Sequence, residues 1–153
     1  MGVEVPRESF EEEEYQAFAE KLRVNLQALD LLAQRPGFGQ GAASIGTELE
    51  LNLVGEDGAP AMVNSEVLAD IDDERLTLEV NRFNLEINAR PCPLAGRPFS
   101  SMHAELGHAL AAARRGARLH GARVAAIGIL PTLERRHLGA SALSDGKRYR
   151  ALA

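Results

Sequence analysis

The sequence has almost none of the residues that would cross-link it or mark it for export. Cys92 is the only cysteine, so an internal disulfide is impossible and a reducing cytoplasm is the simplest compartment. The chain does not open with a basic-then-apolar signal segment, and no apolar run approaches membrane-spanning length. We therefore expect a cytoplasmic protein with no membrane partner.

Positive charge is also scarce. The formal net charge is -5, and Lys21 and Lys147 are the only lysines, so nearly every cation is an arginine. The sequence has no basic stripe with interleaved aromatic residues. These features argue against a nucleic-acid partner, whereas the arginines could make forked contacts with carboxylates or phosphates if a site needs them.

Several familiar catalytic motifs are missing. The sequence has no P-loop, no G-x-S-x-G, no H-E-x-x-H and no C-x-x-C pair. Residues 37–42 fit the letters of the dinucleotide fingerprint G-x-G-x-x-A. That fingerprint must follow a strand and open a helix, whereas here it follows a predicted helix and opens a predicted strand. We therefore interpret this glycine-rich stretch as a connector.

What the sequence does contain is a set of strands that are apolar on one side and acidic on the other. Residues 44–54, 76–80 and 83–89 alternate with period 2, as half-buried strands do. If these strands share a sheet, its polar face carries four carboxylates and no lysine or arginine. The four are Glu48, Glu50, Glu79 and Glu86.

Two interpretations of this acidic face remain open. An antiparallel sheet with one face in water is expected to alternate, and its carboxylates need no special role. Such faces usually mix charges, because like charges on neighbouring strands repel. A hard divalent cation such as Mg²⁺, which takes oxygen ligands, would supply the missing counter-charge. Glu48 and Glu50 are roughly 6.5 to 7 Å apart along one strand, a spacing that suits two sides of one metal site or two adjacent metals.

The remaining segments predict an α+β domain with helices packed on one face of a mainly antiparallel sheet. Residues 7–35 have an apolar stripe at helical spacing, with Ser9 as a candidate N-cap, and we expect that stripe to pack on the core. A second helix is predicted from Ser100 or Ser101 to about Gly121, and residues 123–130 read as a buried strand.

Three local features leave further expectations. Residues 91–93 read Pro-Cys-Pro and are expected to stop the third strand. Arg82 is the one cation near the acidic face, and it would either hold a substrate carboxylate or pair with a neighbouring glutamate. An exposed edge of such a sheet would be expected to pair with another chain, so we predict a homo-oligomer.

With these landmarks placed, the chain resembles the N-terminal part of the glutamate–cysteine ligases, in particular the type-2 carboxylate–amine ligase branch of the glutamine-synthetase-like superfamily. The resemblance rests on four ordered signals between residues 44 and 152. They are Gly46-Thr47-Glu48-Leu49-Glu50, then Leu78-Glu79 with Phe83-Asn84-Leu85-Glu86-Ile87-Asn88, then Ile127-Gly128-Ile129-Leu130-Pro131-Thr132, and Arg148-Tyr149-Arg150.

The resemblance implies an ATP- and Mg²⁺-dependent ligase of glutathione biosynthesis that joins a carboxylate, expected to be that of glutamate, to an amine through an acyl phosphate. It implies that the acidic face binds Mg²⁺ and that ATP is a substrate. The residue roles it implies fall into three groups. They are Glu48, Glu50 and Glu86 as metal ligands, Glu79 and Arg82 as substrate-binding residues, and Arg148 and Arg150 as catalytic contacts to phosphate or carboxylate.

The resemblance also divides the chain. Residues 1–43 are expected to form an N-terminal helix and glycine loop, and residues 44–153 the N-terminal portion of a partial glutamine-synthetase-like catalytic domain. The family's catalytic domain is longer than this chain, so we expect an incomplete fragment with little activity by itself. The alternative is a non-catalytic, oligomeric binding module that uses the acidic face of the sheet.

Overall fold

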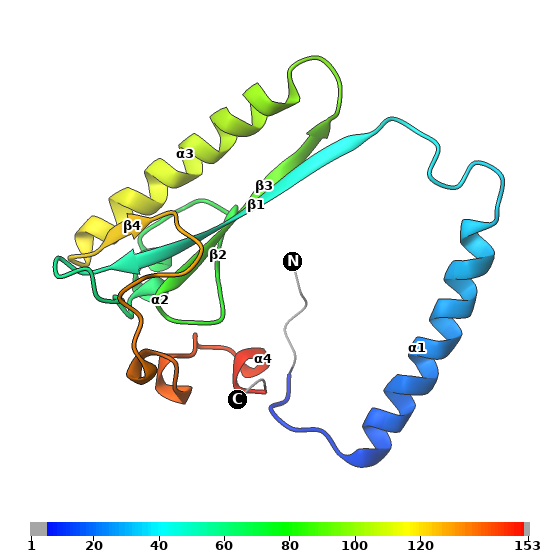
Figure 1. Ribbon diagram of the computed structural model, residues 1–153, viewed down its shortest axis with the longest axis horizontal. Coiled ribbons are helices and arrows are strands. Elements are labelled where there is room, and N and C mark those ends of the chain that lie inside the picture. Colours follow the sequence, from blue (N-terminus) through cyan, green and yellow to red (C-terminus); the bar gives the residue numbers. More distant parts are fainter. Residues whose placement is uncertain (1–5, 152–153) are drawn as a thin grey trace.

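The computed structural model describes residues 6–151 and contains a four-stranded sheet with a long helix across one face (Figure 1). The strand order is β2-β3-β1-β4, and every neighbouring pair is antiparallel. The expected α+β class is confirmed. The strands are β1 Ser44–Val54, β2 Leu76–Leu78, β3 Asn84–Pro93 and β4 Arg123–Ala125, and the helices are α1 Glu12–Ala33, α2 Asn64–Ala69, α3 Pro98–Leu119 and α4 Lys147–Arg150, with 3-10 turns at Arg135–His137 and Ala140–Ala142.

The apolar face of the sheet forms the core, as its period-2 pattern predicts. Leu51, Leu53, Leu85 and Ile87 are completely buried on the two central strands. Helix α3 covers them with small side chains, which allow its backbone to lie close to the sheet. Its buried residues are Ala109, Ala112, Ala113, Gly116 and Ala117. Helix α3 begins two or three residues before the predicted serine caps, because Pro98 can take the first helical turn without needing an N–H partner.

Gly116 lies where α3 meets the end of α2. A Cβ on this glycine would lie 2.7 Å from Ile71 Cδ1 and 3.1 Å from Val67 Cγ1. We expect Gly116→Val to lower the free energy of unfolding by about 1–3 kcal/mol, as overpacked cores do. The control is Gly107→Val in the same helix, where a Cβ meets nothing within 4 Å. Urea unfolding followed by circular dichroism should leave the control within about 0.5 kcal/mol of the parent, and equal losses in both variants would contradict this packing.

Strand β3 ends at Pro93, the last residue of the Pro-Cys-Pro sequence, so it extends four residues past the predicted end at Ala89. The β1–β3 register shifts between Ile45, opposite Cys92, and Thr47, opposite Ala89, which leaves one extra residue on β3. A bulge of this kind tolerates a proline, because the residue at the irregularity need not donate to the ladder. The two strands therefore stay paired as far as Ser44 and Pro93.

The predicted strand at residues 123–130 is shorter than expected. Only β4, Arg123–Ala125, pairs with the end of β1, and the chain then leaves the sheet. The buried side chain of Asn52 donates to the Ile127 carbonyl at 2.9 Å, which fixes the chain in its new direction. Consequently Ile129, expected to be buried, is 84% exposed.

Helix α1 stands apart from the sheet (Figure 1), so the prediction that its apolar stripe packs on the core is wrong. None of its residues is buried, and Phe18 is 65% exposed. The reason is that α2 and α3 already occupy the apolar face of the sheet, while the opposite face carries carboxylates. The helix begins two residues later than a Ser9 cap would set it. Glu11 is the N-cap, and its N–H donates to the Glu14 carboxylate at 3.0 Å.

No helix in residues 6–151 is long and apolar enough to cross a membrane.

Candidate functional site

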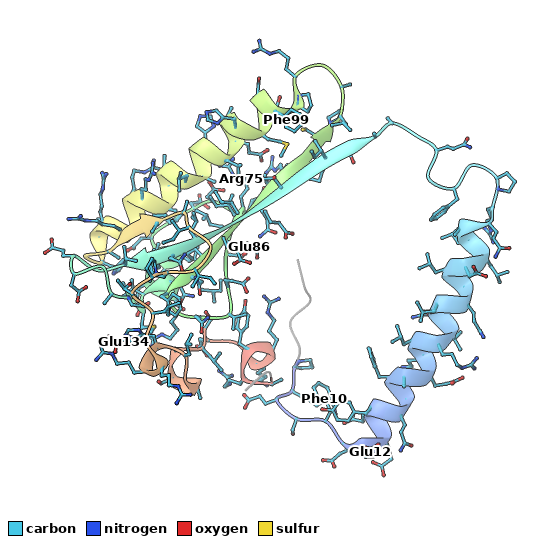
Figure 2. All side chains as sticks on the ribbon, in the orientation of Figure 1. Phe10, Glu12, Arg75, Glu86, Phe99 and Glu134 are labelled. Atoms are coloured by element: carbon cyan, nitrogen blue, oxygen red, sulfur yellow. The ribbon has the colours of Figure 1, made fainter. Side chains whose placement is uncertain are left out.

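The carboxylates of the predicted acidic face lie on neighbouring strands of the sheet. In the antiparallel register Glu50 is opposite Glu86 and Glu48 is opposite Asn88, while on the other side of β3 Thr77 is opposite Glu86. Directly opposed residues have Cβ atoms about 4.5–5.5 Å apart, and like charges at that spacing repel. Glu86 projects from the face of the sheet that α3 does not cover (Figure 2).

The Glu86 carboxyl shows the effect of this arrangement. Its pKa is raised above the ordinary value of 4.5, chiefly because burial disfavours the charged form, and further because of the nearby charges of Glu79, Glu48 and Glu50. A hydrogen bond from Asn88 acts in the opposite direction. The structure therefore brings Glu48, Glu50 and Glu79 within electrostatic reach of Glu86.

The raised pKa of Glu86 predicts how the stability of the metal-free protein changes with pH. The folded protein keeps a proton on Glu86 at pH values where the unfolded chain has lost it, so the stabilisation is fully present below the unfolded pKa and is lost as pH rises through the folded pKa. In EDTA, the melting temperature of the parent relative to Glu86→Gln should fall as pH rises from about 4 to 7.

Asp73 provides a control of opposite sign. The hydrogen bond from Arg75 holds the pKa of the Asp73 carboxyl below its usual value of 3.8. Its stabilisation is therefore present above the unfolded pKa and is lost as pH falls through the folded pKa. The parent should gain stability over Asp73→Asn as pH rises across the acid range. If Glu86→Gln followed the same trend as Asp73→Asn, the account of Glu86 would be wrong.

The C-terminal segment brings Arg148 and Tyr149 to the edge of this face. The Tyr149 side chain is buried, its hydroxyl donates to the Leu78 carbonyl at 2.9 Å, and the Arg148 guanidinium donates to the same hydroxyl while lying 4.5 Å from the ring centroid. Burial raises the pKa of Tyr149, Arg148 lowers it, and the charges of Glu79 and Glu86 raise it further. Tyr149 is therefore the contact that ties Arg148 to the end of β2, where Glu79 follows Leu78.

One comparison with known proteins identifies the chain. Residues 44–153 match the family described as glutamate–cysteine ligase family 2. The chain belongs to glutamate–cysteine ligase family 2. This family match includes all the strands and the carboxylates of the acidic face, as well as α2, α3 and α4. No curated protein matches the chain, and no solved structure does either.

Membership in glutamate–cysteine ligase family 2 places the chain in a ligase family, as the sequence resemblance implied. The match begins at Ser44, the first residue of β1, and leaves out α1 and the glycine-rich connector.

Two of the arginines singled out from the sequence lie away from the acidic face of this family-2 chain. Arg82 donates to the Met62 carbonyl at 3.0 Å and lies 3.8 Å from the Glu66 carboxylate of α2. Arg150 pairs with Glu8 at 2.7 Å and with Asp145. Arg82 and Arg150 line one surface hollow together with serines of α2 and of the C-terminal segment. Both therefore belong to a corner beside the acidic face.

A buried polar cluster that the sequence analysis missed holds this corner together. The completely buried Asn64 amide donates to the carbonyls of Asn81 and Asn84 and to Ser144 Oγ at 2.8 Å. Ser144 in turn donates through its hydroxyl to the Glu79 carbonyl and through its N–H to the Val80 carbonyl. The cluster fastens the C-terminal segment to the β2–β3 connection, next to Glu79. The only sequence signal is Asn64 itself, and an asparagine at the start of a short helix is equally typical of an N-cap.

The acidic face is not a preformed metal cage. Within residues 6–151, no three histidine, cysteine, aspartate or glutamate side chains are already grouped closely enough to hold a metal ion. Glu48 and Glu50 are exposed, while Glu79 and Glu86 are half-buried. The carboxylates thus form an open, negatively charged surface on which further oxygen ligands could complete a coordination sphere.

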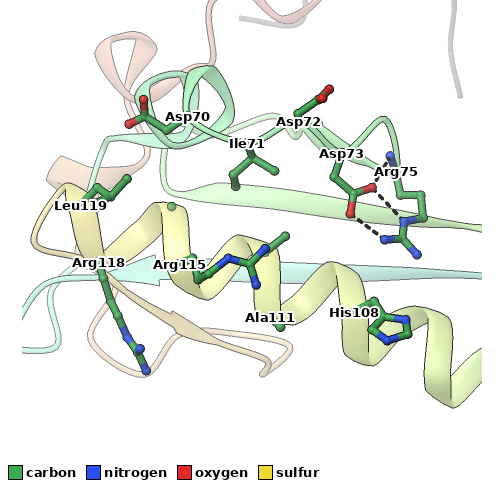
Figure 3. Close-up of a pocket in the computed structure, with 12 residues that line it drawn as sticks. Asp70, Ile71, Asp72, Asp73, Arg75, His108, Ala111, Arg115, Arg118 and Leu119 are labelled. Carbon is green, nitrogen blue, oxygen red and sulfur yellow. Dashed lines mark hydrogen bonds and ion pairs between the residues drawn. The ribbon is translucent and has the colours of Figure 1, made fainter.

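A separate hollow lies across the sheet, between α3 and the segment that joins α2 to β2 (Figure 3). Its walls carry Asp70 and Asp72 on one side and Arg115 on the other. Arg75, at one end, is held by Asp73 at 2.6 Å and by the Glu105 carbonyl. None of the residues singled out from the sequence lines this hollow, and the Arg75–Asp73 pair has a structural role in fixing the start of β2.

Proposed function

We propose that this chain supplies the metal-holding sheet of an ATP- and Mg²⁺-dependent ligase that joins the carboxylate of glutamate to an amine. The family match supports the ligase class, and the acidic face supports the metal. The observation that carries the proposal is the convergence of four carboxylates on one face, with the pKa of Glu86 raised by burial and by its acidic neighbours.

The chemistry of the face fits Mg²⁺. Its donors are carboxylate oxygens, which hard cations prefer, and a cation would relieve the repulsion among them. Mg²⁺ is commonly held by only one or two protein carboxylates together with substrate phosphates and water. An open face without a complete cage therefore suits a metal that arrives with ATP. In this proposal Glu48, Glu50 and Glu86 hold the metal.

The proposed reaction has two steps. A carboxylate oxygen of glutamate attacks the γ-phosphorus of ATP, ADP leaves, and an acyl phosphate forms. The amine nitrogen then attacks the acyl carbon, inorganic phosphate leaves, and the nitrogen loses a proton as the amide forms. Bound Mg²⁺ would neutralise negative charge on the phosphates during the transfer.

The chain's own residues would bind and orient the reactants. In this proposal Arg148, which donates to Tyr149 at the edge of the face, contacts a phosphate or carboxylate with its forked donors. Glu79 attracts the amine, because it lies near the proposed metal ligand Glu86. Arg82 and Arg150 would act from the adjoining corner, once Arg82 exchanges its pair with Glu66, and Arg150 its pairs with Glu8 and Asp145, for substrate.

Calorimetric titration with Mg²⁺, in the presence and absence of ATP, tests this function. We expect ATP to bind only with Mg²⁺, and Arg148→Ala to weaken that binding by about tenfold, the value of one or two charge-assisted hydrogen bonds. Arg136→Ala is the control, since Arg136 is an exposed arginine paired with Glu134 in the 3-10 turn. Metal binding that ATP neither needs nor strengthens would instead favour a non-catalytic module with a simple cation site.

A further inference from the structure

The exposed side of α1 is the strongest unexplained feature of the molecule. Large apolar side chains along this helix are between 43% and 66% exposed, although soluble proteins seldom leave such a stripe uncovered. The residues on one side of the helix are Tyr15, Phe18, Leu22, Leu26, Leu29 and Leu32, while Val24 and Leu31 are exposed on the other side. Helix α1 also lies outside the residues that match the ligase family. The family match and the acidic face therefore do not account for its exposed apolar side chains.

The spacing of this stripe matches a helix that pairs with another helix. Tyr15, Phe18, Leu22, Leu29 and Leu32 fall at the first and fourth positions of successive heptads, which form the seam of a coiled coil. Asn25 occupies the one remaining seam position. A polar residue at one seam position lowers the stability of the pair without preventing it.

We propose that this seam pairs with α1 of a second copy of the chain, in antiparallel orientation. A parallel pair would set two runs of four glutamates, Glu11–Glu14, side by side. An antiparallel pair places each acidic run near Arg35 of the partner helix instead, so opposite charges meet at both ends. The interaction rests on α1 alone and is independent of the proposed ligase chemistry.

The available surface is large enough for a stable dimer. Helix α1 has 22 residues and is about 33 Å long. Pairing two such helices along an apolar seam removes on the order of 600–800 Å² of surface per chain, close to the amount buried in a standard stable interface. Figure 1 shows α1 projecting from the sheet, so a second helix can lie along it without displacing another element.

Sedimentation equilibrium of the whole chain tests the pairing. We expect a monomer–dimer equilibrium between about 1 and 100 µM. Leu22→Glu and Leu29→Glu should each weaken the dimer about 100-fold or more, because each puts an unpaired charge in the seam. Gln27→Glu makes a similar change on the opposite side of α1 and should leave the constant within about twofold. A monomer throughout, or a dimer insensitive to the seam variants, would overturn the proposal.

Cross-linking tests the orientation. In a Cys92→Ser background, Tyr15→Cys chains mixed with Leu32→Cys chains should form a disulfide-linked dimer on mild oxidation, whereas neither preparation alone should do so. Efficient cross-linking of Tyr15→Cys with itself would overturn the antiparallel arrangement. Circular dichroism of each variant checks that α1 and the sheet are intact, since the substituted side chains are exposed and contribute nothing to the core.

Discussion

Replacing Glu86 with glutamine is expected to weaken Mn²⁺ binding by at least about 10- to 100-fold, the loss seen even when residues that merely support metal ligands are changed. Glu86 lies on the central strand β3, directly opposite Glu50 and within the field of Glu48 and Glu79. Glutamine keeps the shape of the side chain but removes the charge on which a hard cation depends. Mn²⁺ serves as a spectroscopic surrogate for Mg²⁺, and electron paramagnetic resonance measures its free concentration directly.

The control for this experiment is Glu56→Gln. Glu56 is an exposed glutamate in the turn after β1, and its substitution changes the net charge of the chain by the same amount. At fixed ionic strength the control should bind Mn²⁺ as the parent does. An equal loss of Mn²⁺ affinity in Glu86→Gln and Glu56→Gln would mean that binding follows the overall charge of the chain. The acidic face would then not be a specific metal site.

The neighbouring substitution Ile87→Ala should act on folding. Ile87 is completely buried on the opposite face of β3, where it packs in the core beneath α3. Truncating a buried isoleucine removes transfer free energy and leaves a cavity, which together cost about 2–5 kcal/mol. A domain with a typical stability of about 5–15 kcal/mol would lose a large part of it. Urea unfolding of Ile87→Ala should show a midpoint far below that of the parent.

Ile129→Ala is the matched control for this loss. Ile129 has the same side chain but is 84% exposed after β4, so its truncation should change the free energy of unfolding by no more than about 0.5 kcal/mol. Similar stabilities for Ile87→Ala and the parent would contradict the placement of Ile87 in the core. Substitutions at the adjacent residues Glu86 and Ile87 thus test the two faces of β3 separately. Mn²⁺ binding tests the acidic face, and urea unfolding tests the core face.

The strands and their faces could be predicted because alternation is a local property with a fixed period. A side chain at every second position must point to the same side, so Leu51 and Leu85 were identifiable as core residues and Glu50 and Glu86 as residues of the other face. The pattern also indicated strands that could share one sheet, and in the structure β1 pairs with β3. It did not contain their register, which depends on where the bulge near Ile45 falls.

The errors came from interactions that pattern alone does not describe. The stripe of α1 predicts an apolar contact but not its partner, and α3 had already taken the only apolar face of the sheet. Residues 126–130 are as apolar as a strand, yet the Asn52 side chain binds the Ile127 carbonyl and turns the chain away. Both outcomes depend on contacts between residues far apart in the sequence.

The candidate site was predictable in the same uneven way. Its carboxylates lie on one face of the sheet, so period-2 reasoning identified them. Arg82 lies in a turn and Arg148 and Arg150 in the short helix α4, where the strand period does not apply. Only the structure shows that Arg148 lies beside the face while Arg82 and Arg150 lie in the adjoining corner. The role of Tyr149 in holding Arg148 depends on a hydrogen bond to Leu78, which is 71 residues away.

The central claim is that the acidic face binds a divalent cation, and the most direct test is a Mg²⁺ titration followed by amide chemical shifts at constant ionic strength. The account predicts saturable shifts for amides near Glu48, Glu50 and Glu86. It predicts little change around residues 70–73, an equally acidic segment on the other side of the sheet that serves as an internal control. Shifts that never saturate, or that concentrate at residues 70–73, would contradict the claim.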